Sequence, residues 1–223
     1  MKKWLGILIS GALVIAVVSA CVSMGYCQTP TQVSLISPER VRSGEAFWVE
    51  VRVDSVKDFD AANYDITYNP DVIEVIGVTS GVIGGTAIPV DMWGFIPTGV
   101  QGTVRLINNV PNVPGVSGSG YLAKIQFRAI GSCGSTTDII LHNGILGNNL
   151  AQEIEADWFS DSVSVYIIGD ANEDCVVDAS DITTAERMML CLIPESKGAD
   201  ANEDGLVTAL DLTTIERIIL ALS

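Results

Sequence analysis

Two segments near the C-terminal end of the chain carry oxygen-bearing side chains at alternating positions. Residues 170–192 and 200–222 both begin with DANED, and they align without a gap with 14 identities in 23 positions. Carboxylate and amide oxygens at every second position suit Ca²⁺, which takes about six to eight oxygen ligands from a curled loop. The repeat therefore predicts two calcium-binding loops, each leading directly into a helix.

The expected ligands stand at positions 1, 3, 5, 7, 9 and 12 of each loop. In the first loop they are Asp170, Asn172, Asp174, the Val176 carbonyl, Asp178 and Asp181, and in the second they are Asp200, Asn202, Asp204, the Leu206 carbonyl, Thr208 and Asp211. The sequence therefore predicts two Ca²⁺ ions. Because Thr208 stands where the first loop has an acid, the two sites should differ in affinity.

Position 6 of the loop distinguishes the two copies. The turn there requires a positive φ, which Gly205 adopts freely and which costs Cys175 about 1 kcal/mol. A single acidic stretch of this kind could be a solvated turn. Two copies in phase, each followed by a helix, favour calcium binding.

Apolar residues recur at helical spacing after each loop, so each predicted helix has one apolar stripe. The stripes consist of Ile182, Ala185, Met188, Met189 and Leu192, and of Leu212, Ile215, Ile218, Ile219 and Leu222. No helical pattern precedes either loop. Two short helices bury little apolar area, so folding of this region should depend on the metal.

Two loop–helix units without preceding helices resemble a dockerin, the small duplicated calcium module that binds cohesins in cellulosome-type assemblies. The resemblance covers residues 169–223. It implies contacts with a cohesin from loop positions 10 and 11 and from the helices, at Ala179, Ser180, Glu186, Arg187, Ala209, Leu210, Glu216 and Arg217. The repeated Glu-Arg pair implies two binding orientations, and the change from Ser180 to Leu210 favours one of them.

The middle of the chain, residues 32–168, has short runs of strand-forming residues separated by Gly, Pro, Asn and Ser. The predicted strands are 32–36, 46–53, 61–68, 72–78, 103–108, 121–129, 138–146 and 162–168. Many short strands with such turns indicate an antiparallel β-sandwich or jelly roll. The fold class is therefore mainly β with a small α module.

Three segments of this region, 43–53, 61–81 and 120–131, resemble a cohesin in their order and pattern. The resemblance implies a β-sandwich that binds a dockerin through one flat sheet face. Alternation along residues 61–68 places Tyr64, Ile66 and Tyr68 inward. The outward residues Asn63 and Asp65 are the predicted partner contacts.

The first 20 residues have the pattern of an export signal. Lys2 and Lys3 precede an apolar run, Trp4–Ala20, and the sequence VSAC then matches a bacterial lipobox with Cys21 as the lipidated residue. An ordinary cleaved signal or an uncleaved anchor are the alternatives. The predicted organisation is a signal (1–20), a tether (21–31), the sandwich (32–168) and the calcium module (169–223). The protein is expected to be secreted and attached to the cell surface by a lipid.

Four further cysteines, Cys27, Cys133, Cys175 and Cys191, could form disulfides outside the cytoplasm. Three pairings are possible, and the sequence does not select one of them.

Catalysis and nucleic-acid binding find little support in the sequence. His142 is the only histidine, no nucleophile or phosphate-binding motif occurs, and the net charge of −15 opposes contact with nucleic acid. We therefore expect a non-catalytic extracellular adaptor that binds a cohesin-bearing protein through its C-terminal module and a dockerin-bearing protein through its sandwich. The alternative is a surface module that binds polysaccharide and carries a dockerin, and a glycosidase is the third choice.

Overall fold

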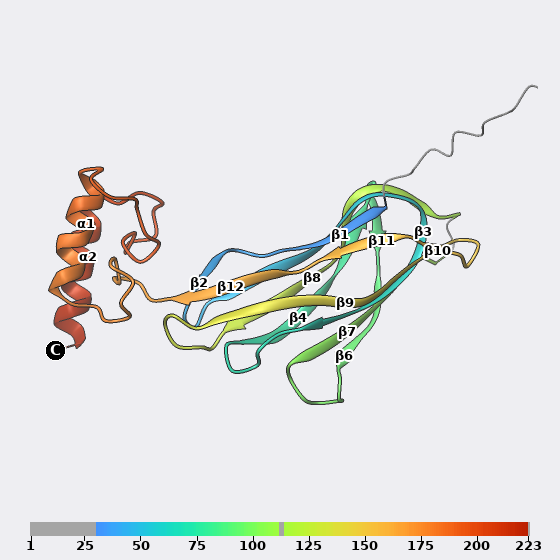
Figure 1. The fold of residues 1–223 in the computed structure, drawn as a ribbon, viewed down its shortest axis with the longest axis horizontal. Coiled ribbons are helices and arrows are strands. Elements are labelled where there is room, and N and C mark those ends of the chain that lie inside the picture. Colours follow the sequence, from blue (N-terminus) through green and yellow to red (C-terminus); the bar gives the residue numbers. More distant parts are fainter. Residues whose placement is uncertain (1–29, 112–113, 223) are drawn as a thin grey trace, which may run out of the picture.

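The computed structural model describes residues 30–111 and 114–222 (Figure 1). In this part of the chain a β-sandwich is followed by two helices. The strands are β1 (Thr31–Ile36), β2 (Arg40–Arg42), β3 (Ala46–Thr67), β4 (Ile73–Ile83), β5 (Thr86–Ile88), β6 (Val90–Phe95), β7 (Thr103–Asn109), β8 (Val116–Ala129), β9 (Thr136–Asn148), β10 (Glu153–Ile154), β11 (Ala156–Phe159) and β12 (Asp161–Tyr166), and the helices are α1 (Ala179–Met189) and α2 (Ala209–Leu222).

Strand β3 belongs to both layers of the sandwich. Its first half pairs with β1 and β8, and its second half pairs with β7 and β9. Between the halves, register shifts occur around Val56, and Ser55 and Asp58 have positive φ values of 51° and 52°. These bulges bend the strand, so the sheet curls on itself and encloses one core.

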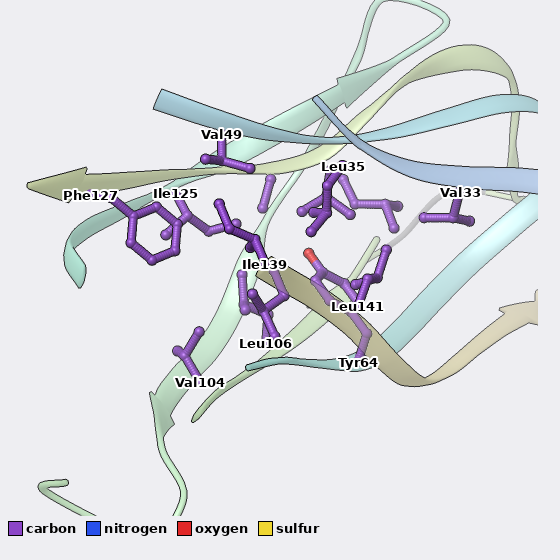
Figure 2. Close-up of a cluster of buried hydrophobic side chains, with 14 of the residues drawn as sticks. Val33, Leu35, Val49, Tyr64, Val104, Leu106, Ile125, Phe127, Ile139 and Leu141 are labelled. Atoms are coloured by element: carbon purple, nitrogen blue, oxygen red, sulfur yellow. The ribbon is translucent and has the colours of Figure 1, made fainter. Parts of the chain in front are cut away.

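Large apolar side chains from both layers fill that core (Figure 2). Val49 and Phe127 come from one layer, Leu106 and Leu141 come from the other, and all are buried. Removing each such side chain from water contributes roughly 1.5–3 kcal/mol. Tyr64, Ile66 and Tyr68 are also buried, which confirms the predicted inward face of residues 61–68.

The predicted strands all lie in observed strands or end within two residues of them, and the mainly β fold class is confirmed. One prediction was wrong in detail, because residues 46–53 and 61–68 belong to the single strand β3. The short strands β2, β5, β6, β10 and β11 were not predicted. Two pairings, β1 with β11 and β2 with β12, are parallel, so the sandwich is not purely antiparallel.

The two helices pack on each other over a small core of their own. Ala185, Met188 and Ile215 are buried there, as the helical stripes predicted. Met189, the last residue of α1, is exposed instead, and Leu192 is exposed because the helix has ended before it. The structure says nothing of the side chain of Leu222. Neither helix in the described residues has the length and hydrophobicity that crossing a bilayer requires.

The backbone at Gly144 packs closely against the Trp158 ring. A Cβ atom there would lie 2.2 Å from the Trp158 ring, which packs against the core with its centroid 6.1 Å from that of Tyr64. Gly144→Ala must displace the ring, so we expect a loss of about 1–3 kcal/mol in the free energy of unfolding. Gly147→Ala on the same strand meets nothing closer than 3.8 Å and is the matched control. Equal stability of the two variants in urea would contradict this packing.

Candidate calcium loops and the exposed sheet face

The first loop is closed by backbone hydrogen bonds to its own carboxylates. Asp170 accepts from the N–H groups of Asp174 at 3.1 Å and Cys175 at 3.0 Å. Asp181, in the first turn of α1, accepts from Asn172 N–H at 3.0 Å and Asp178 N–H at 2.9 Å. These hydrogen bonds attach the side chains at positions 1 and 12 to the backbone of the curled loop.

The second loop repeats this arrangement almost atom for atom. Asp200 accepts from the N–H groups of Asp204 at 3.1 Å and Gly205 at 2.9 Å. Asp211 accepts from Asn202 N–H at 3.0 Å and Thr208 N–H at 2.8 Å. The sequence identity of the two copies therefore extends to their hydrogen-bond geometry.

Buried carboxylates give the loops an excess of negative charge. Asp170 is 3% exposed, and Asp181 and Asp211 are fully buried. None of the five ion pairs formed by the described residues includes a predicted calcium ligand. Burial, together with the nearby charge of Asp181, raises the pKa of Asp170 above its ordinary value.

The predicted ligands fit a hard divalent cation. Buried negative charge is costly even when backbone N–H groups donate to it, and a cation beside these carboxylates would offset that cost. Carboxylate, amide and carbonyl oxygens in a curled loop are the ligands that Ca²⁺ prefers. Asp170, Asn172, Asp174, Asp181 and the Val176 carbonyl would hold one ion, and their counterparts in the second loop would hold the other.

Position 9 has a second role, as the cap of each helix. Asp178 precedes α1, accepts a hydrogen bond from Ser180 N–H at 2.7 Å, and shares a capping box with Asp181. That hydrogen bond lowers the pKa of Asp178. Thr208 occupies the same place before α2, where its hydroxyl accepts from Leu210 N–H at 3.3 Å. Because a Thr side chain lacks the negative charge of Asp178, the predicted difference in affinity still stands as a prediction.

Position 6 has the backbone conformation expected from the sequence. Gly205 has a φ of 88°, and Cys175 has a φ of 67° although it carries a side chain. The reason for a cysteine at this position is a disulfide between Cys175 and Cys133, in the loop between β8 and β9. Of the pairings left open by the sequence, the structure selects this one. Cys191 is exposed and free, and Cys27 and the proposed lipidation residue Cys21 lie outside the described residues.

The residues that the dockerin resemblance assigned to partner contact all lie exposed on one module. They are Ala179, Ser180, Glu186, Arg187, Ala209, Leu210, Glu216 and Arg217. Ser180 is engaged locally, because its hydroxyl accepts from the Asn172 amide at 2.9 Å. Leu210 is 65% exposed. The two copies therefore present a hydroxyl in one place and a leucine in the other.

The second candidate surface is the outer face of β9, β3, β7 and β6. Asn63 and Asp65 point to this face, opposite the buried Tyr64, as predicted. However, Asp65 is only 3% exposed. Its two oxygens accept from Arg105 Nε and Nη2 at 2.7 Å each, and one also accepts from the Asn143 amide at 2.9 Å.

Arg105 covers Asp65 and is therefore the charged group that this face presents, with 43% of its side chain exposed. The hydrogen bond from the Arg105 guanidinium lowers the pKa of Asp65 despite its burial. Sequence reasoning missed Arg105 and Asn143, because their contact with Asp65 depends on the register of three strands. The alternating pattern TVRLIN around Arg105 was the only signal that the residue faces outward.

His142 lies at the same face and has a structural partner. Its Nε2 is 2.8 Å from the Thr67 hydroxyl, which also lies 2.9 Å from the Thr103 hydroxyl. Neighbouring hydroxyls, an imidazole and a bidentate ion pair thus make this face a hydrogen-bonded surface.

A sandwich whose β9–β3–β7–β6 face is exposed, joined to two calcium-type loop–helix units, is typical of a two-domain protein-interaction chain. Models of known families match it in two parts, a cohesin domain at residues 31–165 and a dockerin type I domain at residues 168–220. The chain thus belongs to the cohesin family and carries a type I dockerin domain behind its cohesin domain. Domains of these kinds are non-catalytic interaction domains, and type I dockerins typically bind calcium. No match was found among curated proteins.

Solved structures show the same fold at low sequence identity. A non-cellulosomal cohesin from the archaeon Archaeoglobus fulgidus is 17% identical, with a TM-score of 0.52 over 61% of this chain and 91% of that one. The Coh-OlpA–Doc918 complex from Clostridium thermocellum aligns at 14% identity and a TM-score of 0.52, over 61% of this chain and 99% of that one. The Coh-OlpC–Doc435 complex from the same organism aligns at 14% identity and a TM-score of 0.51, over 62% of this chain and 95% of that one.

Removal of calcium tests the loops directly. Chelation leaves the buried acids without a counter-charge, so EDTA should lower the helical circular-dichroism signal at 222 nm while the near-ultraviolet signal of the sandwich persists. Adding back Ca²⁺ in excess should restore the helices, and Mg²⁺ at equal concentration is the control ion. Helicity that does not respond to EDTA would rule out calcium-linked folding.

Proposed function

We propose that this protein is a non-catalytic adaptor that binds two different proteins at once in the presence of calcium. The C-terminal module binds a cohesin on another protein, and the cohesin domain binds a dockerin on another protein. The observation that carries this proposal is the separation of the two candidate faces. In Figure 1 the helices lie beyond the end of the sandwich marked by β2 and β12, away from β6 and β7, so the module leaves the sheet face uncovered.

The sheet face has the composition of a protein-binding surface. Exposed apolar residues, Met92, Ile140 and Ile145, surround the ion pair of Arg105 and Asp65. Arginine and apolar residues are enriched where protein interfaces are buried most deeply. Since Asp65 holds the guanidinium in place and is itself held by the Asn143 amide, Arg105 would lose little side-chain freedom on binding.

The module face differs in character and would suit a different partner. It combines the exposed Leu210 with the two Glu-Arg pairs along α1 and α2. If the module bound the sheet face of a second copy, the contact would be head-to-tail and open-ended. We propose the adaptor in preference to such a polymer, because an exported chain that polymerises with itself would be difficult to control.

The proposed location is outside the cell, with a lipid on Cys21 as the anchor. The export pattern of residues 1–21 motivates this proposal. One feature that supports this location is the Cys133–Cys175 disulfide, because disulfides persist mainly in oxidising compartments. Calcium loops of modest affinity would also be filled at the millimolar calcium levels of that environment.

Polysaccharide binding, the alternative, needs exposed aromatic rings in one plane. Trp48 lies on the outer face of the β3–β8 layer, while Trp93 is paired with the buried Leu106 and so lies on the inner side of β6. Trp158 packs partly buried against the core. The three rings therefore lie on different surfaces, which favours the protein partners.

A binding panel with matched variants tests the proposal. The protein, in Ca²⁺, is measured by calorimetry against purified dockerins and cohesins, and by pull-down on insoluble cellulose and chitin. Arg105→Ala should weaken dockerin binding by about tenfold or more, which corresponds to a loss of about 1.4 kcal/mol or more. The matched control is Arg128→Ala, because Arg128 is an exposed arginine that pairs with Glu74 on the other layer.

Cohesin binding by the C-terminal module should be unchanged in both variants. Binding to the glycans with no protein partner in the panel would contradict the adaptor. Equal effects of the two arginine variants would contradict the assignment of the sheet face.

A further inference from the structure

The calcium module contacts the sandwich through three separate elements. The chain passes from β12 into the first loop within a few residues, and Ile168 of this segment packs on the small core of the module. Gly169 N–H donates to the Gly198 carbonyl at 2.9 Å. The connecting segment is therefore part of the module and not a free linker.

The second element consists of two ion pairs, which involve the same position in each copy of the internal repeat. Position 4 of the first loop, Glu173, pairs with Arg40, and position 4 of the second loop, Glu203, pairs with Arg42 at 3.2 Å. The two arginines stand two residues apart in β2, so their side chains leave the same face of the strand. One short strand thus contacts both calcium loops.

The third element is the disulfide between Cys133 and Cys175. It joins the β8–β9 loop to position 6 of the first calcium loop, and Cys133 Sγ also lies 3.4 Å from Asp170 Oδ2. The ion pairs are weak by comparison, because Glu173 and Glu203 keep 45% and 49% of their side-chain exposure. The covalent bond is thus the strongest of the three connections.

We propose that Cys133–Cys175 is a redox-sensitive clamp that holds the calcium module in one orientation on the cohesin domain. The clamp acts on the loop side of the module, and none of its residues is among the eight assigned to partner contact. It therefore fixes the direction of the helices relative to the sheet face without covering either one. The clamp does not depend on which protein each face binds, so it can be tested separately from the proposed function.

A dithiol reductant would open the clamp. The disulfide takes up two electrons and two protons and becomes two thiols, and the reductant becomes a cyclic disulfide. The module would then remain attached through residues 167–169 and the two ion pairs. We expect these to permit motion of the module as a unit, because exposed ion pairs form and break readily.

Nuclear magnetic resonance relaxation on the full chain tests the clamp, with Ca²⁺ present throughout. In the oxidised protein, residues 31–165 and 170–222 should tumble with one correlation time. In the double variant Cys133→Ser, Cys175→Gly, the module of 55 residues should tumble faster than the sandwich by roughly a factor of two. The glycine reproduces position 6 of the second loop, so the variant keeps a favourable loop conformation.

Two further samples keep the result interpretable. Arg40→Gln, Arg42→Gln retains the disulfide and should keep a single correlation time. The unmodified protein treated with dithiothreitol in Ca²⁺ should show the same faster tumbling of the module. This sample provides the test if the double variant does not fold. A single correlation time in the folded double variant or in the reduced protein would overturn the clamp, because the linker and ion pairs would then be sufficient.

Discussion

The structure of the C-terminal domain depends on carboxylates that are buried without a cationic side chain beside them. Asp181 and Asp211 each close a loop by accepting two backbone hydrogen bonds, and each lies in the first turn of a helix. The apolar core around Ala185 and Ile215 is small, and the burial of negative charge beside it opposes folding. We propose that a bound cation resolves this conflict, so that metal binding and folding of the domain are coupled. The surface that the helices offer to a partner would then depend on filled loops.

Position 6 of the first loop connects this calcium chemistry to the cohesin domain. Cys175 accepts a backbone conformation that glycine adopts more easily, and in return it forms the bond to Cys133. Closing a loop of 42 residues stabilises a fold by about 4 kcal/mol in the chain-entropy description, well above the cost of about 1 kcal/mol for the backbone. The two calcium loops are thus alike in their hydrogen bonds and different in their attachment to the sandwich. That difference gives the pseudo-symmetric module a defined direction on the sandwich.

Local patterns in the sequence were sufficient for the loops and for the faces of the strands. The alternation of Asp170, Asn172 and Asp174 reports ligand spacing, and the alternation of Tyr64 and Asp65 reports inside and outside. The burial of Asp65 could not be predicted, because it follows from the register that places Arg105 and Asn143 beside it. The pairing of Cys133 with Cys175 depends on how the two domains meet, and the early end of α1 depends on the exposed turn that follows Met189. These features arise from tertiary contacts, which composition and periodicity do not encode.

We propose that one chain connects two proteins through separate faces, one of which depends on calcium. Analytical ultracentrifugation of the chain, with a dockerin-bearing and a cohesin-bearing protein that it binds, measures this directly. In Ca²⁺ we predict a ternary complex with one copy of each protein, and in EDTA a binary complex that has lost only the cohesin-bearing protein. Exclusion of one partner by the other, or growth of the chain into large assemblies in Ca²⁺ with no partner added, would contradict an adaptor with two separate faces.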